Sequence, residues 1–259
     1  MDVVYLFQHS KFDNAEIRIS LRSVAEHFPW VRKVWVFGDR PAFLSDDTTI
    51  IEHVPWEAVA WLRHVQVPVR NFFLQTLLVA LHPEVAAEFL VFCDDNVLLG
   101  ELTEEVAKRD RVFEDLATLK ARGKGLWKES LWRTYDWLKR LGYTGFNFET
   151  HTPTYFTKKR VFEAYRDLHD FVTEDRYAGM LAETAILNHA YQQHPFPLTW
   201  LHEEGLHIGI HRKPMSYDEI VERTAGKMFL NFDDHTFNAD MQRFLAERFP
   251  EPCVYERKS

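Results

Sequence analysis

The stretch from Glu88 to Asn96 constrains the fold of this chain more than any other. It places the apolar run Phe89 to Phe92 directly before two adjacent carboxylates, Asp94 and Asp95. A strand buried on both faces of a parallel sheet reads as such a continuous apolar run. Ligands of open α/β sheets bind beyond the carboxyl ends of the strands, so we expect Asp94 and Asp95 to face a ligand there. The alternative is an ordinary turn, because Asp and Asn favour turns through local hydrogen bonds.

The first 100 residues predict the front half of a doubly wound α/β sheet. We expect a helix capped by Asp13, with Glu16 in the capping-box position, to end at Pro29. A second, strongly apolar helix is expected over about Val69 to Leu81. No Gly-rich phosphate loop is present, so phosphates must be held in another way. The expected strands are Val3–Phe7, Lys33–Phe37, Thr49–Val54 and Phe89–Phe92.

A helical, basic insertion is expected at about residues 103–143, with no strand signal. Between residues 118 and 142, seven cations face only Glu129 and Asp136, and three Trp and one Tyr are interleaved with them. One interpretation is an amphipathic helical hairpin whose aromatic side chains lie in the core. The other is a basic, aromatic wall for a polyanionic or sugar-bearing acceptor, because cations attract phosphates and ring faces stack. The candidate acceptor-binding residues are Lys124, Trp127, Lys128 and Arg133.

The C-terminal half predicts further strands and helices. Strands are expected around His151 within residues 146–156, and a last strand precedes the acidic pair Asp233 and Asp234. Residues 206–211 alternate with period two, which places His207 and His211 on one strand face. The expected helices are Lys158–Phe171, Ala182–Gln192, Tyr217–Thr224 and Ala239–Arg248.

Composition narrows the class of protein. The 259 residues suit one domain, and the net charge of −8 argues against a protein that coats nucleic acid generally, while still allowing a local basic patch. Cys93 and Cys253 have no metal-ligand spacing and indicate a reducing compartment. No signal peptide and no apolar window of membrane-spanning length is present, so we expect a cytoplasmic protein without a membrane span.

Three blocks of the sequence together resemble the Stealth family of polysaccharide sugar-phosphate transferases, and the glycosyltransferases related to the base J DNA glucosyltransferase. The resemblance implies a GT-A-like, Rossmann-type fold, a nucleotide-sugar donor such as a UDP-sugar, and Mn²⁺ or Mg²⁺ at a DxD-type site. The chain departs from the Stealth pattern at residues 7–10, which weakens the phosphotransferase interpretation. It also has Asn96 at the third acidic position, which leaves open whether Asp94 or Asp95 holds the metal. The blocks are residues 13–41, 88–100, and 227–234 with 249–256.

Candidate roles follow from the chemistry of sugar transfer. Asp94 and Asp95 would hold the metal, with His211 or His207 as a third ligand unless these are ordinary histidines. An inverting reaction needs a base, for which we expect Asp233 or Asp234, with His151 as the second choice; a retaining reaction needs none. Arginine offers a planar fork to oxyanions, although the same arginines would also suit a solvated helix face. The candidate donor contacts are His9, Arg18, Arg22, Arg70, Asn71 and Asp94.

Three hypotheses stay open on the sequence alone. The first is a metal-dependent glycosyltransferase acting on a hydroxyl acceptor, which is a hydroxymethylated pyrimidine in phage DNA, a cell-surface or capsular glycan, or a protein or small molecule. The second is a sugar-phosphate transferase, which would release a nucleoside monophosphate in place of a diphosphate. The third is a catalytically silent binding module, against which the two intact acidic pairs argue.

Overall fold

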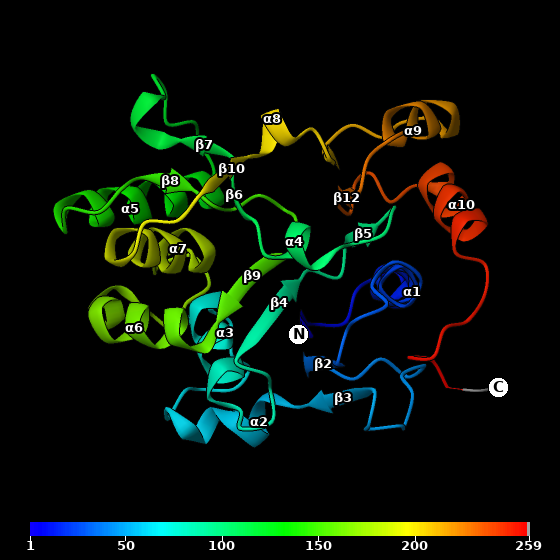
Figure 1. Ribbon diagram of the computed structural model, residues 1–259, viewed down its shortest axis with the longest axis horizontal. Helices are drawn as coiled ribbons and strands as arrows, with labels where there is room; N and C mark the ends of the chain where they lie inside the picture. Colours follow the sequence, from blue (N-terminus) through cyan, green and yellow to red (C-terminus); the bar gives the residue numbers. More distant parts are fainter. Residues whose placement is uncertain (258–259) are drawn as a thin grey trace.

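A five-stranded sheet forms the centre of the computed structural model, which describes residues 1–257. The strand order is β3-β2-β1-β4-β9, in which the first four strands run parallel and β9 runs antiparallel to β4 (Figure 1). The expected α/β class with a Rossmann-type sheet is confirmed, as are its four N-terminal strands. The bounds are β1 (Asp2–Phe7), β2 (Lys33–Gly38), β3 (Ile51–Val54), β4 (Glu88–Phe92) and β9 (Thr154–Thr157).

Helices cover both faces of this sheet because its strands are apolar on both faces. Successive side chains of a strand point to opposite faces, so Val4 packs in one core while Val3 and Tyr5 pack in the other. Helices α3 (Phe72–Leu81), α6 (Lys158–Leu168) and α7 (Ala182–Gln193) lie on the first face, and α1 (Ala15–His27) lies on the second (Figure 1). This two-sided burial explains the continuous apolar runs in the sequence.

A smaller sheet lies beside the first, in the order β11-β12-β5. Strand β5 follows β4 after a short turn, and it brings the second sheet against the carboxyl edge of the first. Helices α9 (Tyr217–Thr224) and α10 (Ala239–Arg248) pack on it around a third core. Its strands are β5 (Asn96–Leu98), β11 (His207–Ile210) and β12 (Phe229–Phe232).

The insertion differs from the expectation, because residues 110–112 and 114–115 form two short strands. Arg111 on β6 is almost fully buried in an ion pair with Glu204, so a charged residue occupies a strand position and hides the apolar signal. The prediction of a helical hairpin is also wrong, since residues 118–142 contain one long helix, α5 (Leu126–Arg140). The remaining elements are α2 (Trp56–Val59), η1 (Ala60–Leu62), α4 (Glu104–Ala107), β6 (Asp110–Val112), β7 (Glu114–Asp115), η2 (Leu116–Thr118), α5 (Leu126–Arg140), β8 (Phe146–Asn147), η3 (His169–Phe171), β10 (Leu198–Trp200) and α8 (Leu201–Glu204).

The predicted start of the first helix is wrong. Asp13 does not cap α1, because Asp13 and Asn14 both have left-handed backbone angles, with φ of 53° and 61°. The Glu16 carboxylate accepts a hydrogen bond from Ser10 Oγ at 2.7 Å and therefore does not close a capping box. The turn after β1 is held instead by these local contacts, which also shape the loop at the sheet edge.

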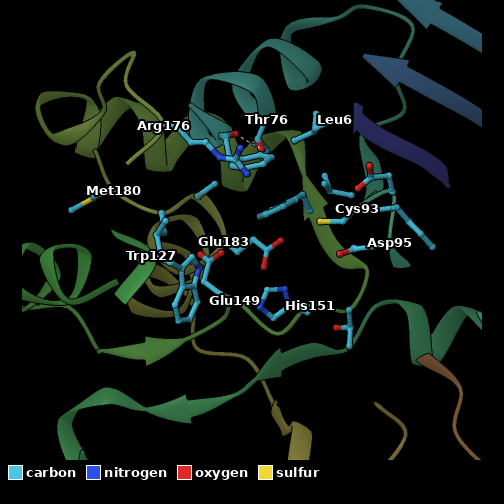
Figure 2. Close-up of a pocket in the computed structure, with 18 of the residues that line it drawn as sticks. Leu6, Thr76, Cys93, Asp95, Trp127, Glu149, His151, Arg176, Met180 and Glu183 are labelled. Atoms are coloured by element: carbon cyan, nitrogen blue, oxygen red, sulfur yellow. Dashed lines mark hydrogen bonds between the residues drawn. The ribbon is translucent and has the colours of Figure 1, made fainter. Parts of the chain in front are cut away.

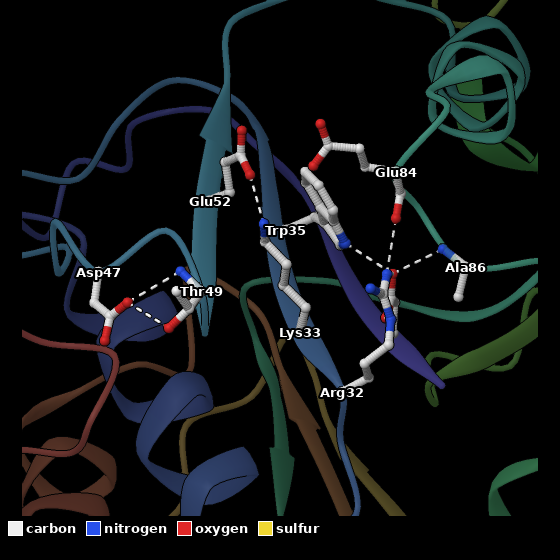
Figure 3. Close-up of polar contacts among 9 residues, drawn as sticks. Arg32, Lys33, Trp35, Asp47, Thr49, Glu52, Glu84 and Ala86 are labelled. Carbon is white, nitrogen blue, oxygen red and sulfur yellow. Dashed lines mark hydrogen bonds and ion pairs between the residues drawn. The ribbon is translucent and has the colours of Figure 1, made fainter.

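At the opposite edge of the sheet, the buried Asp2 carboxylate fixes the alignment of the central strands. It accepts hydrogen bonds from Arg32, from Trp35 Nε1 and from the Ala86 amide, groups that converge in Figure 3. These donors belong to the segments that start β2 and precede β4, so one carboxylate ties three strands together. Within residues 1–257, no helix is long and apolar enough to cross a membrane.

Candidate functional site

The candidate site lies where the strand order of the main sheet reverses. The chain runs from β1 outward to β2 and β3, and then returns to β4 on the other side of β1. The crevice beyond the carboxyl ends of β1 and β4 is therefore the expected ligand position of an α/β sheet. Two cavities open there, with volumes of about 640 Å³ and about 350 Å³, which we call the outer pocket and the inner cavity. Both are lined by Leu6, Phe72, Asp94 and Arg176, so they adjoin.

The outer pocket gathers residues from the ends of β1 and β2 and from the segment before α3. His9 lies here, with its amide donating to Asp39 Oδ2 at 2.8 Å, as do Lys11 and Arg70. Of the predicted donor contacts, the structure therefore brings His9, Arg70 and Asp94 together. Asn71 does not join them, because it is buried and its amide oxygen caps α3 by accepting from the Phe73 and Leu74 amides.

The inner cavity is rich in carboxylates. Asp94 and Asp95 reach it from the end of β4, Glu149 from the loop between β8 and β9, and Glu183 from the first turn of α7 (Figure 2). Among the lining residues, all within the described part of the chain, Arg176 is the only one with a permanent positive charge. Its lining also includes Trp127, His151, Cys93 and apolar side chains.

Burial sets the electrostatics of the acidic pair at the end of β4. It raises the pKa of Asp94 to about 6, and the nearby Glu16 carboxylate adds to this effect. Burial likewise raises the pKa of Asp95 well above its ordinary value, and the charge of Asp94 is the next cause. Two close carboxylates in a poorly solvated site favour a bound cation or a proton. Burial, followed by His211, lowers the pKa of His151 to about 4, so its ring is neutral near pH 7.

The residues around Asp95 fit a divalent metal held mainly by substrate oxygens. Asn231 is fully buried, and neither its amide oxygen nor its amide nitrogen has a well-formed hydrogen bond. It lies near Asp95 and His211, whose pKa values it influences. Within residues 1–257, no three His, Cys, Asp or Glu side chains are clustered as metal ligands, so Asp94, Asp95 and His211 do not form a preassembled triad. A preassembled triad is not required, because Mg²⁺ commonly binds through one or two protein carboxylates together with the phosphates of the substrate.

Arg18 and Arg22 do not reach either pocket, and their assignment to the donor is a correction. Arg22 pairs with Glu256 at 2.6 Å and also donates to the Phe249 carbonyl at 2.9 Å. Arg18 lies 3.5 Å from the same carboxylate and over the Phe43 ring. Both guanidinium groups are used to attach the C-terminal segment to α1. They thereby join the first and third of the sequence blocks that resemble the Stealth pattern.

The two carboxylates of the second acidic pair, Asp233 and Asp234, lie in different environments. Asp233 accepts hydrogen bonds from the backbone amides of Arg212, His235 and Thr236, so both of its carboxylate oxygens hold the local turn. These bonds lower its pKa, against the effect of burial, and a base role for Asp233 does not fit. Asp234 is exposed, pairs with Lys11 at 3.0 Å and lines the outer pocket.

The four predicted acceptor-binding residues do not all lie at the inner cavity. Trp127 lines the inner cavity, with its ring 6.3 Å from that of His151, and the Lys128 ammonium lies 4.9 Å from the Trp127 ring centre. Arg133 instead donates to the Tyr177 carbonyl, which is a structural contact. Lys124 is exposed and lines neither the outer pocket nor the inner cavity.

His207 on β11 and His211 directly after it lie as the alternation predicts. A side chain built at Gly209 would meet both His207 and His211, so these two rings lie on the same face of the strand. The His211 ring also lies 5.4 Å from that of His151. Three histidines from two segments are therefore close together beside the inner cavity.

Sequence reasoning missed Glu149, Glu183 and Arg176 as cavity residues. Glu183 stands at the start of a predicted helix and Glu149 two residues before His151, positions where acidic residues are common for other reasons. The missing signal was the contact between these segments: Glu149 Oε1 accepts from the Thr184 amide at 3.0 Å. Only the folded chain brings the two carboxylates together.

No protein-family model matches the chain, and no curated protein matches it. Among solved structures, two of the galactosyltransferase LgtC are similar to it. One is an active-site mutant, with 13% identity and a TM-score of 0.48, and the match covers 97% of each chain. The other is a complex with donor and acceptor sugar analogues, with 14% identity, a TM-score of 0.48 and the same coverage.

Proposed function

We propose that this protein is a GT-A-like glycosyltransferase that moves a sugar from a nucleotide sugar to a hydroxyl acceptor with the help of a divalent metal. The observation that carries the proposal is the position of Asp94 and Asp95. They follow the strand at which the sheet order reverses, and they stand where an outer pocket and an inner cavity adjoin. The resemblance of the three sequence blocks supports the same class. In the structure two of these blocks are in contact, because Ser20 Oγ donates a hydrogen bond to the Asn96 carbonyl.

The outer pocket suits the nucleotide diphosphate. Lys11, Arg70 and Arg176 give it three cationic side chains around the crevice, and His9 adds an imidazole at the end of β1. Arginine and lysine bind phosphate oxygens through charge-assisted hydrogen bonds. Trp56 also lines the pocket, with a ring that is largely buried against Phe37. A donor bound in this way directs its sugar toward Asp94 and the inner cavity.

Mn²⁺ or Mg²⁺ held by Asp94 or Asp95, with the Asn231 amide oxygen nearby, would neutralise the departing diphosphate. The chain itself binds the nucleotide in the outer pocket and orients the sugar toward the inner cavity. The apolar side chains of the inner cavity, including Val91 and Met180, exclude bulk water from the reacting carbon. The acceptor oxygen forms its new bond at that carbon as the bond to the diphosphate breaks.

The acceptor enters the inner cavity beside Trp127, whose ring can stack on a sugar or on an extruded base. For a DNA acceptor carrying a hydroxymethylated pyrimidine, the exposed Lys124 and the nearby Lys128 would meet backbone phosphates outside the cavity. A glycan acceptor would use Trp127 and the cavity carboxylates without those cations. The salt dependence of binding separates these two acceptors.

A nucleotide-release assay tests the proposal. The protein is incubated with a panel of UDP-, GDP- and CMP-sugars, with Mn²⁺, with Mg²⁺ or with a chelator. We expect release of a nucleoside diphosphate that requires the metal and is lost in Asp95→Asn. Release of a nucleoside monophosphate from a UDP- or GDP-sugar would identify the sugar-phosphate transferase instead. If no nucleotide sugar binds or turns over with either metal, the chain is not a nucleotide-sugar transferase.

A further inference from the structure

The inner cavity contains a pair of carboxyl groups that the proposed donor and metal do not use. Glu149 and Glu183 both line it, and their side chains lie close together in Figure 2. Asp94 and Asp95, at the other wall of the cavity, are the residues that would hold the metal in the proposed reaction. Arg176, the one permanent cation among the described lining residues, lies by the rings of Phe72 and Tyr177. The glutamate pair therefore has no positive charge of its own.

We propose that Glu149 and Glu183 act as one proton-sharing pair that contacts the acceptor hydroxyl and takes its proton during transfer. This inference rests on the proposed function and names the base of that reaction. In the resting protein the pair holds one proton between its two carboxyl groups. The acceptor oxygen attacks the sugar carbon, the bond to the diphosphate breaks with its electron pair, and the hydroxyl proton passes to the pair, which becomes neutral.

The geometry fixes the pair at the acceptor side of the cavity. Glu149 Oε1 accepts from the Thr184 amide at 3.0 Å, and Thr184 Oγ1 accepts from the Phe148 amide at 3.2 Å. These two bonds join the loop after β8 to the first turn of α7, which carries Glu183. His151 and Trp127 line the same cavity, so an acceptor that enters beside Trp127 meets the pair before it meets Asp95.

Electrostatics supports the sharing of a proton. Burial raises the pKa of Glu149, and it raises the pKa of Glu183 well above its ordinary value, with Glu149 as the second cause. The hydrogen bond from the Thr184 amide favours the anion of Glu149 over that of Glu183. A carboxylate that is costly to keep ionised in a buried site is a stronger base than one in water, which suits it to take a proton near neutral pH.

The two other candidates are less well placed. Asp234 lines the outer pocket, where the nucleotide is expected, and its carboxylate is paired with Lys11. His151 lines the inner cavity, but its low pKa of about 4 makes it a weak acceptor of a proton.

The test compares Glu149→Gln and Glu183→Gln with wild type, using water as the acceptor and the nucleotide sugar that supports release by wild type. Glutamine keeps the shape of each side chain, and in Glu149→Gln the side-chain amide oxygen can still accept from the Thr184 amide. We expect each variant to bind donor with unchanged Kd and to unfold at an unchanged temperature, while release falls by about 10²- to 10⁴-fold. The double variant should lose no more than the worse single variant, because the two groups act as one unit.

The matched control is Glu203→Gln, because Glu203 is exposed and lines neither the outer pocket nor the inner cavity; this variant should keep the activity of wild type. Full release by either glutamate variant, or an additive loss in the double variant, overturns the shared pair. So does loss of release in Asp234→Asn or His151→Gln with both glutamate variants active. Donor that neither binds to nor reacts with wild type counts against the proposed function itself, and that outcome is measured before any variant is made.

Discussion

The ion pair between Arg22 and Glu256 gives a prediction that separates a structural role from a donor-binding role. The Arg22 guanidinium makes two hydrogen bonds to the Glu256 carboxylate, of 2.6 and 3.0 Å, and two more to the carbonyls of Phe249 and Pro250. The side chains of Arg22 and Glu256 are 14% and 6% exposed, so solvent screens the pair little. Arg22→Ala would leave a buried carboxylate with only Arg18, at 3.5 Å, to balance it.

The expected loss in the free energy of unfolding follows from the burial of the Arg22–Glu256 pair. Removing one partner of a buried, hydrogen-bonded pair costs about 3 to 5 kcal/mol, because the other charge stays buried. Arg18 offsets part of this loss, so we expect Arg22→Ala to lower the free energy of unfolding by about 3 kcal/mol. Arg22→Ala combined with Glu256→Ala should cost less than the sum of the two single changes, because no unpaired charge is left.

Urea unfolding followed by circular dichroism measures these values, and calorimetry measures donor affinity in parallel. The matched control is Arg243→Ala, since Arg243 pairs with Glu247 at 2.8 Å but the two side chains are 62% and 49% exposed. That change should cost less than about 1 kcal/mol. The reasoning is refuted if Arg22→Ala is no more destabilising than Arg243→Ala, or if it chiefly weakens donor binding, as the sequence alone suggested.

Three further results are expected. Asp95→Ala should abolish turnover and metal-dependent donor binding in calorimetry with little loss of stability, because burial already disfavours that carboxylate; unchanged affinity would contradict the metal assignment. Burial lowers the pKa of His82, so the folded state resists protonation of this ring. The unfolded state takes up the proton as the pH falls below about 6.5, and the free energy of unfolding therefore decreases. His82→Gln should lose less stability than wild type between pH 7.5 and pH 5. With a hydroxymethylcytosine-containing duplex, Lys124→Ala combined with Lys128→Ala should reduce the salt dependence of binding by up to about two phosphate contacts, while salt-independent binding would exclude DNA and leave the glycan.

Strands β1, β2 and β4 of the main sheet were predictable because each contains a short apolar run, as expected for a strand that is buried on both faces. The run Phe89 to Phe92 is fully packed between two cores, and the carboxylates that follow it lie at the expected edge. Helix α10 was predictable because its local periodicity reports which face is buried.

Charged residues with distant partners could not be placed in this way. Arg22 is an ordinary helix cation in the sequence, and its partner lies 234 residues away. Arg111 occupies a strand position only because Glu204 neutralises it inside the protein. Glu149 and Glu183 belong to different elements, and their proximity is a property of the packing of α7 against the loop after β8. A pattern within one segment carries no information about any of these three contacts.

Helix α5 of the basic insertion is attached to the segment before α7 by a small group of hydrogen bonds around the Tyr177 carbonyl. The Tyr177 carbonyl accepts from Ser130 Oγ at 2.7 Å and from Arg133, and the Leu181 amide donates to Thr134 Oγ1 at 2.9 Å. Helix α5 therefore supports the segment that leads into α7. For protein engineering, residues 103–143 are not an exchangeable module: a chimera that replaced them alone would remove the support of residues 177–181, so the two segments must be transplanted together.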